Sequence, residues 1–546
     1  VCGSGCGYNR IQDAIDAASP GETIEVHSGT YEEHVEVNKQ LTLRGVVTGD
    51  GLPVVDAGGS VSAITISADG CTVEGFEARN SGSAWPCAGI HVTSKGNIIS
   101  DNTASKNKWD GISLRNSNGN MISGNTLTSN DASGIYLESS KSNAIENNTA
   151  MSNSQNGIML SECSNNAISG NNASQNSLWG IYLFQSVGNT LRNNGANKNR
   201  NAGIFVHDNS RDNIIKDNTA NINSDKGISL RKSINNTISN NIAAGNTYGI
   251  FLDSSTSNTI SGNTATGPAA GNSTGIYLVS SSGNTISGNT ATGNIYGIWL
   301  TSSRSNNISS NTATGNDYGI YIYVSSNNNI ISGNTANGNE DFGIILHSSI
   351  SNIISDNIVG SNRIGISLQY SSSNNISGNT ATGNTNSGIY LPSSNSNSIT
   401  SNTASGNYYG IILNSSSSNN ISNNSVIDNQ LGIRLSTSHG NTIYLNHFHN
   451  TNNSWSDGIN LWNSPKVNPN YNNYTGNYWS DYDGTDSNMD GIGDQAYPID
   501  GGLDLDNYPM MDDITLKGGA IQISLDGSLQ TTPPANQAQY FLKITN

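Results

Sequence analysis

The chain has 546 residues, of which 34% are hydrophobic and only 12% charged, whereas soluble domains average about 25% charged. Its 23 Lys and Arg residues against 40 Asp and Glu give a net charge of −17, which excludes the positive surface that nucleic-acid binding requires. No stretch approaches the roughly 18 apolar residues of a membrane span. No signal peptide begins at Val1, so we expect a cleaved, mature form of an extracellular or cell-surface protein.

Residues 1–22 are predicted to form an N-terminal cap. Residues 11–18 place Ile11, Ala14, Ile15 and Ala18 on one face of a short helix that covers the open end of the strands after it. The chain has five cysteines, and in an oxidising compartment two disulfides could form near this end, with Cys163 left unpaired and the connectivity open. The four candidates are Cys2, Cys6, Cys71 and Cys87.

Strands are expected at residues 23–26, 35–37, 41–43 and 63–66, and a repeat then dominates the chain. Gly-Ile-x-Leu, or a close variant, recurs every 22 to 26 residues from Gly89 to Gly432. The unit is too short for two helices and alternates with period 2, as in Gly249–Leu252, so Ile and Leu point inward and the residue between them points outward. Residues 23–450 are therefore predicted to form an all-β parallel β-helix, a solenoid of stacked coils.

A second pattern, Asn-x-Ile-Ser-x-Asn, lies between the glycines, as at Asn258–Asn263. We interpret these asparagines as structural: Asn tolerates left-handed turns, and stacked Asn side chains bond to one another along a solenoid. Eight coils also carry an aromatic residue two positions after the repeat glycine, which predicts an outward ladder of rings that stabilises the sheet or binds sugars or another subunit. These residues are Tyr136, Tyr182, Phe205, Phe251, Tyr277, Trp299, Tyr321 and Tyr390.

Three segments resemble a known family. Residues 8–33 are similar to the opening of pectate-lyase-like β-helix proteins, and the Asn repeats look like the NosD-like repeats of secreted right-handed β-helices, the carbohydrate-binding and sugar-hydrolase group. Residues 477–510 resemble the segment that closes many of these proteins. The resemblance implies a right-handed, single-stranded β-helix of the kind abundant in archaeal cell-surface proteins, on a fold that hosts lyases, hydrolases and adhesins alike.

Residues 451–513 are predicted to form an irregular C-terminal cap that binds calcium. Oxygen ligands recur at positions 1, 3, 5 and 9 of one loop, and Gly491 permits the turn that directs a backbone carbonyl at the same centre. Three carboxylates this close would repel one another without a cation. The expected ligands are Asp486, Asn488, Asp490, Ile492 and Asp494.

Residues 514–546 alternate like strands but are too few to close a β-sandwich, so we expect a partial sandwich or strands that add to a neighbouring copy.

Asn-x-Ser/Thr sequons are glycosylation candidates in a secreted chain, with unmodified surface turns as the alternative. They begin at Asn147, Asn172, Asn235, Asn272, Asn307, Asn375, Asn414, Asn420, Asn423, Asn452 and Asn473.

Two functions fit these features. The first is a structural subunit of an extracellular wall, sheath or filament, with copies of itself or other surface proteins as partners and calcium as the stabilising ion. The second is a protein that binds or cleaves carbohydrate. No cluster of carboxylates predicts catalysis. His447 and His449 share one face of a strand, but no Met or Cys is adjacent to them, so we do not expect a copper site.

Overall fold

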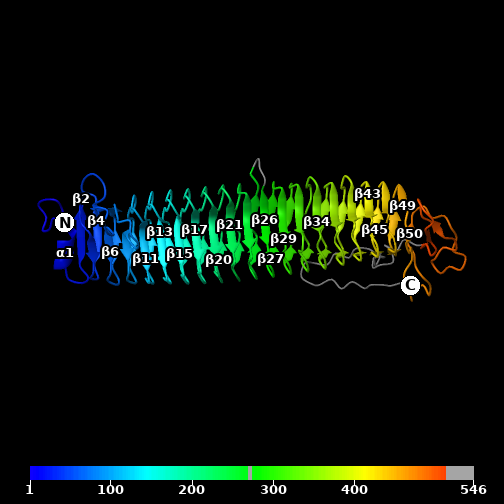
Figure 1. The fold of residues 1–546 in the computed structure, drawn as a ribbon, viewed down its shortest axis with the longest axis horizontal. Helices are drawn as coiled ribbons and strands as arrows, with labels where there is room; N and C mark the ends of the chain where they lie inside the picture. The colour runs from blue at the N-terminus through cyan, green and yellow to red at the C-terminus, as the bar shows by residue number, and fades with distance from the viewer. Residues whose placement is uncertain (269–272, 512–546) are drawn as a thin grey trace, which may run out of the picture.

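A computed structural model describes residues 1–268 and 273–511, and it is a long solenoid with the N-terminus at one end (Figure 1). Each coil contributes short strands to parallel sheets that run the length of the rod, here called sheets A, B and C. Pairing between neighbouring coils is parallel throughout the solenoid, as between β29 and β32, where Trp299 lies opposite Tyr321. The predicted all-β parallel solenoid is confirmed.

Within the described residues, sheet C has 19 strands, and the repeat glycines lie in or directly before most of them. Its strands are β3 (Val35–Val37), β6 (Ile64–Ile66), β9 (Ala88–Val92), β11 (Asp110–Arg115), β13 (Ile135–Glu138), β15 (Ile158–Ser161), β17 (Trp179–Phe184), β19 (Ala202–His207), β21 (Lys226–Arg231), β23 (Tyr248–Asp253), β26 (Thr274–Val279), β29 (Tyr296–Thr301), β32 (Tyr318–Tyr323), β34 (Phe342–His347), β37 (Ile364–Gln369), β40 (Ser387–Pro392), β43 (Tyr409–Asn414), β46 (Leu431–Ser436) and β49 (Asn452–Ser456).

Sheet A also has 19 strands. They are β1 (Thr23–His27), β4 (Thr42–Val46), β7 (Thr72–Glu74), β10 (Ile98–Ser100), β12 (Met121–Ser123), β14 (Ala144–Glu146), β16 (Ala167–Ser169), β18 (Thr190–Arg192), β20 (Ile214–Lys216), β22 (Thr237–Ser239), β24 (Thr259–Ser261), β27 (Thr285–Ser287), β30 (Asn307–Ser309), β33 (Ile330–Ser332), β35 (Ile353–Ser355), β38 (Asn375–Ser377), β41 (Ser398–Thr400), β44 (Asn420–Ser422) and β47 (Thr442–Tyr444).

Sheet B is interrupted, and isolated bridges continue it between its strands. The strands are β2 (Thr30–Tyr31), β5 (Val54–Asp56), β8 (Glu77–Arg79), β25 (Thr264–Thr266), β28 (Thr290–Thr292), β31 (Thr312–Thr314), β36 (Ile358–Gly360), β39 (Thr380–Thr382), β42 (Thr403–Ser405), β45 (Ser425–Ile427), β48 (His447–His449) and β50 (Tyr478–Trp479). The solenoid thus extends past residue 450, where its end was predicted.

The core is built from repeated columns of buried side chains. In one coil, Ile298 and Leu300 of β29, Ile308 of β30 and Ala313 of β31 are all fully buried. The repeat glycine is required because a Cβ on Gly297 would lie 2.5 Å from the carbonyl oxygen of the equivalent glycine one coil on. The inward Ile and Leu predicted from the repeat are confirmed.

Asparagine ladders run along the turns of the solenoid, as predicted. Asn311 is representative: its Oδ1 accepts hydrogen bonds from the backbone N–H and Nδ2 of Asn289, at 3.0 and 2.9 Å. Its own Nδ2 donates to the carbonyl of Ile286 and to Oδ1 of Asn334, at 2.8 and 3.0 Å. The left-handed backbone was expected at asparagine, but in these turns the preceding residue adopts it, as Gly262 does with φ of 64° before Asn263.

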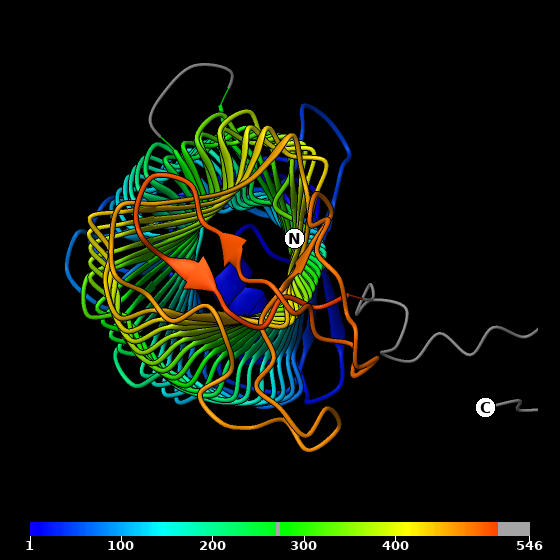
Figure 2. The ribbon, with the colours of Figure 1, turned by 90° about the vertical axis from the view of Figure 1, so that its right-hand side faces the viewer.

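Caps close both ends of the rod. Helix α1 (Ile11–Ala17) lacks a side-chain cap of its own, and the buried carboxylate of Glu33 instead accepts the N–H groups of Ile11 and Gln12, at 2.8 and 3.1 Å. At the other end the antiparallel pair β51 (Tyr497–Pro498) and β52 (Leu505–Asp506) belongs to a cap whose orange strands cross the opening in Figure 2.

A buried carboxylate holds the C-terminal cap to the last coils. Asp506 is fully buried, and its Oδ2 accepts hydrogen bonds from the backbone N–H of Asn477 at 2.8 Å and from Nε1 of Trp479 at 2.9 Å. Burial raises the pKa of Asp506 to about 6. The predicted terminal strands, residues 514–546, lie outside the described part of the chain.

Candidate functional site

The outer face of sheet C carries two adjoining columns of aromatic rings. The first is the predicted ladder, in which Tyr277 and Trp299 stack at 4.3 Å between ring centroids and Trp299 and Tyr321 at 6.5 Å. The second column, one residue before the repeat glycine, was missed, because strict alternation places that residue inside. It consists of Trp179, Tyr248, Tyr296, Tyr318, Phe342 and Tyr409.

The two columns pack against each other. Tyr296 stacks on Trp299 at 4.6 Å, and Trp179 lies 4.5 Å from Tyr182, centroid to centroid. Most of these rings are half-buried, and neighbouring rings stack on one another, so only part of each ring is left to solvent. The aromatic face defined by these two columns is therefore an apolar strip on the outside of the solenoid, interrupted at Lys226 and Ser229 of β21.

A small hydrophobic cluster, separate from the core, extends the aromatic face toward the C-terminal end. Its buried members are Phe342, Ile345 and Ile364, with Tyr321 and Tyr390 packed against it. Beyond it, β37, β40, β43 and β46 line a hollow of about 310 Å³ at Tyr390, Tyr409 and Arg434. The ladder residue Tyr390 thus belongs to this pocket, which no sequence pattern indicated.

Polar and titratable side chains gather near the other end of the same face. Burial raises the pKa of Asp110 to about 7, although the backbone N–H of Ser133 donates to its Oδ1 at 2.9 Å. Burial also raises the pKa of Tyr136 to about 12, with the Glu138 carboxylate adding to the shift. A carboxyl group that titrates near neutrality can transfer protons, but Asp110 is only 3% exposed and so does not face a substrate.

The predicted calcium loop has the expected turn but not a closed cluster of carboxylates. Asp486 accepts the N–H groups of Asp490 and Gly491 at 3.2 and 2.8 Å, and Gly491 has φ of 85°. Asn488 Oδ1 also accepts the N–H of Asp490, while Asp494 accepts the Ser487 hydroxyl at 2.7 Å. The N–H of Ile492 donates to Asp490. Among the described residues, these carboxylates do not form a group of three within 4.8 Å of one another.

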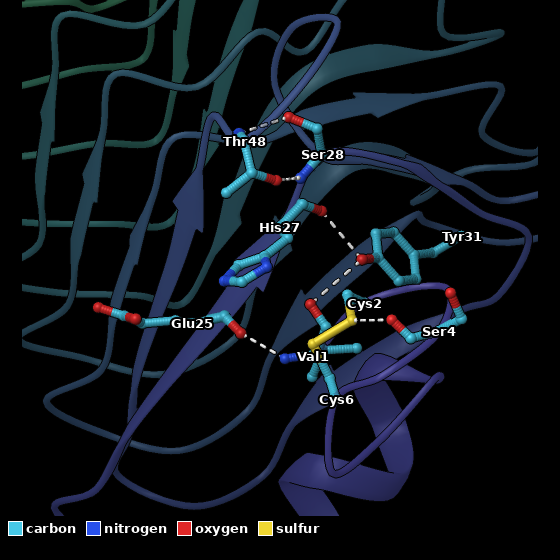
Figure 3. The surroundings of a disulfide bond; sticks show 9 residues. All are labelled: Val1, Cys2, Ser4, Cys6, Glu25, His27, Ser28, Tyr31 and Thr48. Carbon is cyan, nitrogen blue, oxygen red and sulfur yellow. Dashed lines mark hydrogen bonds between the residues drawn. A yellow bond between two sulfur atoms is a disulfide. The ribbon is translucent and has the colours of Figure 1, made fainter.

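The cysteines form one disulfide, between Cys2 and Cys6 (Figure 3). Two disulfides were expected among four candidate cysteines with the connectivity open, but the other two candidates, Cys71 and Cys87, are free thiols. Cys163 is buried and takes the place of a ladder serine, since its N–H donates to the Ser186 hydroxyl at 3.1 Å. Asn272 is not among the described residues. The other sequon asparagines lie outside the buried ladders and are exposed or half-buried; they are Asn147, Asn172, Asn235, Asn307, Asn375, Asn414, Asn420, Asn423, Asn452 and Asn473.

The sequence matches the family described as "Periplasmic copper-binding protein (NosD)" over residues 48–194, 267–372 and 324–484. It also matches the "Right handed beta helix region" over residues 151–272, which gives the solenoid its hand. No curated protein matches the chain. In the part of the chain that the structure describes, no helix has the length and apolar character needed to cross a membrane.

Several solved structures are weakly similar. The Dettilon tailspike protein is 17% identical with a TM-score of 0.38, covering 59% of this chain and 61% of its own. DFA-IIIase from Arthrobacter chlorophenolicus in complex with GF2 is 14% identical with a TM-score of 0.34, covering 53% and 83%. A mutant of the periplasmic alginate epimerase AlgG is 14% identical with a TM-score of 0.31, covering 68% and 84%. These values are too low to imply an activity for this chain.

Copper, named in the family description, does not fit the described residues. Their one group of three His, Cys, Asp or Glu side chains with ligand atoms within 4.8 Å of one another is Cys2, Cys6 and His27. Both sulfurs are joined in the disulfide beside His27 (Figure 3), so a single imidazole remains where copper sites need several His, Cys or Met ligands. His447 and His449 flank the buried Phe448 and join no such group.

Proposed function

We propose that this chain, which belongs to the NosD family of right-handed β-helices, is an exported protein that binds carbohydrate along the outer face of sheet C. The aromatic face carries this proposal. Sugar rings present apolar C–H faces bordered by hydroxyl groups, and half-buried tyrosine and tryptophan rings offer a matching apolar surface with polar edges.

The geometry of the solenoid supports a long ligand over a small one. Coils repeat about every 4.8 Å, so rings on successive coils, such as Phe251, Tyr277 and Trp299, follow one another closely along the strip. Such a strip contacts successive units of an extended polymer, and many weak contacts then act together. Some of the same rings also stabilise the sheet by stacking across strands, which contributes about 0.2–1 kcal/mol per pair to folding. This role is compatible with ligand binding.

Trp299→Ala tests the proposal at the centre of the aromatic face. Binding to a panel of neutral and acidic polysaccharides, measured by affinity electrophoresis and on a glycan array, should weaken about twofold to tenfold. Tyr444→Ala is the matched control, since Tyr444 is a half-buried aromatic residue in β47 of sheet A. Equal losses in both variants, or polysaccharide binding that survives Trp299→Ala unchanged, would contradict binding at this face.

The same face favours a second candidate function, a subunit of an extracellular assembly. The half-buried rings of the aromatic face would suit a neighbouring copy placed side by side, whereas capped ends oppose end-to-end stacking. Electron microscopy and light scattering over a range of protein concentrations distinguish the two functions. Ordered lateral polymers that Trp299→Ala disperses would favour assembly, and monomers that bind polysaccharide would favour carbohydrate binding.

A further inference from the structure

The pocket at the C-terminal end of the aromatic face differs from the rest of that face because it contains two arginines. Tyr390, Ile412 and Arg434 occupy the same register position on β40, β43 and β46. Tyr409 lies beside them, and Arg363 closes the pocket on the side of β37. The buried side chains of Ile364 and Ile412 contribute apolar surface to the lining.

Arg434 is held by aromatic rings rather than by an acid. Its Cζ lies 5.1 Å from the ring centroid of Trp455 and 5.8 Å from that of Tyr409. No carboxylate among the described residues forms an ion pair with it, while six other arginines of sheets A and C or their turns have such partners: Arg44, Arg115, Arg192, Arg211, Arg231 and Arg363. Stacking on rings fixes the guanidinium plane and leaves its N–H donors available.

The second arginine lies at the rim, where Asp341 balances its charge. Arg363 Nε lies 2.8 Å from Asp341 Oδ1, and its Cζ lies 5.0 Å from the centroid of Phe342. Its side chain is 45% exposed, so part of the guanidinium faces the pocket opening. The residues that line the pocket include no Asp or Glu. In a chain with a net charge of −17, the unpaired guanidinium of Arg434 in a hollow without lining carboxylates forms a local site for an anion.

We propose that this pocket binds an acidic sugar residue, one that carries a carboxylate or a sulfate ester. The inference rests on the proposed carbohydrate binding and adds the chemical class of the ligand. Arg434 would bind the anionic group through its planar donors, Tyr390 and Tyr409 would contact the ring, and the amides of Asn386 and Asn414 would bond to hydroxyl groups. The polymer then continues from the pocket onto the aromatic face.

Arg434→Gln tests the charge while keeping a polar side chain of similar length. Protein is produced in a host without N-glycosylation, because Asn414 at the pocket is also a sequon asparagine. Affinity for a polyuronate, a sulfated glycan and a neutral glucan is measured by calorimetry in low salt and in about 0.5 M NaCl, where charge interactions are strongly screened. Arg434→Lys keeps the charge, and Arg304→Gln, an exposed arginine in a turn, is the matched control.

We expect Arg434→Gln to lose roughly tenfold to a hundredfold of the affinity for one acidic polymer, as removal of a charge-assisted hydrogen bond does. Affinity for the neutral glucan should change less than about twofold, Arg434→Lys should recover part of the loss, and Arg304→Gln should bind as the unmodified chain does. Which acidic polymer binds distinguishes a carboxylate from a sulfate ester. The loss should shrink in high salt.

Two results overturn the inference. The first is equal affinity for acidic and neutral polymers that Arg434→Gln does not change. If Trp299→Ala still weakens the binding of both polymers, the proposed function survives. The second is an equal loss for neutral glucan in Arg434→Gln, with unchanged thermal stability, which would assign Arg434 a role that does not depend on charge. Absence of any binding that depends on Trp299 contradicts the proposed function itself. Calorimetry with free glucuronate, a ligand too short to span the aromatic face, then tests the pocket separately.

Discussion

Removing one asparagine from a ladder should destabilise the solenoid far more than removing an exposed asparagine of the same coil. Asn311→Ala deletes four side-chain hydrogen bonds: two accepted from Asn289, one donated to the Ile286 carbonyl and one donated to Asn334. The site is 1% exposed, so water does not replace these partners. The N–H of Asn289 and the Ile286 carbonyl each lose a bond, and at about 1–3 kcal/mol per unsatisfied group the expected loss is about 2–6 kcal/mol.

The matched control is Asn307→Ala, which removes an exposed asparagine at the start of β30 and should change stability by less than about 0.5 kcal/mol. Hydrogen exchange read by mass spectrometry localises the effect, since coils contact only their neighbours and the defect should remain near β27, β30 and β33. Thermal unfolding gives the global effect. Equal stability of the two variants, or faster exchange spread evenly along the rod, would refute the ladder as a main source of stability.

The caps and one buried carboxyl group give three further predictions. If the loop at Asp486 binds calcium, EDTA should lower the unfolding temperature and speed exchange in residues 478–511, and calcium should restore both; equal calorimetric traces and no bound ion would contradict it. Because burial raises the pKa of Asp110 to about 7, the folded chain holds a proton that the unfolded chain releases above about pH 4, so stability falls as pH rises from about 4 to 7. Asp110→Asn should flatten this dependence in unfolding measured across that range, and an unchanged profile would contradict it. Glu33→Ala should loosen α1 by about 0.5–2 kcal/mol, visible as faster exchange of the Ile11 and Gln12 amides, whereas Glu32→Ala, a neighbouring change, should not.

The repeat made the solenoid predictable, because the spacing of the glycines and the alternation of Ile and Leu identify each coil separately. Stacking is then a consequence of the shared pattern, so Ile250 and Leu252 are buried as expected. The Asn ladders were predictable for the same reason. Local pattern also identified the helix at the N-terminal end, where the structure places α1.

The aromatic face was only half predictable. Strict alternation fails at the repeat glycine, where Tyr296 comes to lie beside Trp299, so one aromatic column was identified and its neighbour was not. A signal existed, since an aromatic residue directly precedes the glycine in several coils. The pocket had no such signal: Arg363 and Arg434 lie on coils far apart in the sequence, and only the stacking of coils brings them to one hollow. The paired cysteines likewise could not be chosen from spacing.

Because the coils are alike, the length of the rod can change without changing the way in which its coils pack. Each coil makes the same hydrogen bonds to its neighbour through equivalent residues. Excising the residues between two equivalent ladder positions, such as Asn289 and Asn311, would therefore rejoin the ladder and the sheets in register. Each excision would bring Arg434 about 4.8 Å nearer to Tyr277. The example also removes Trp299 with its coil, so Tyr321 would take its place beside Tyr277. If the pocket binds an acidic group as proposed, the distance between that group and the far end of a bound polymer would be adjustable in whole coils. Related chains with different numbers of coils would then select polymer segments of different minimum length.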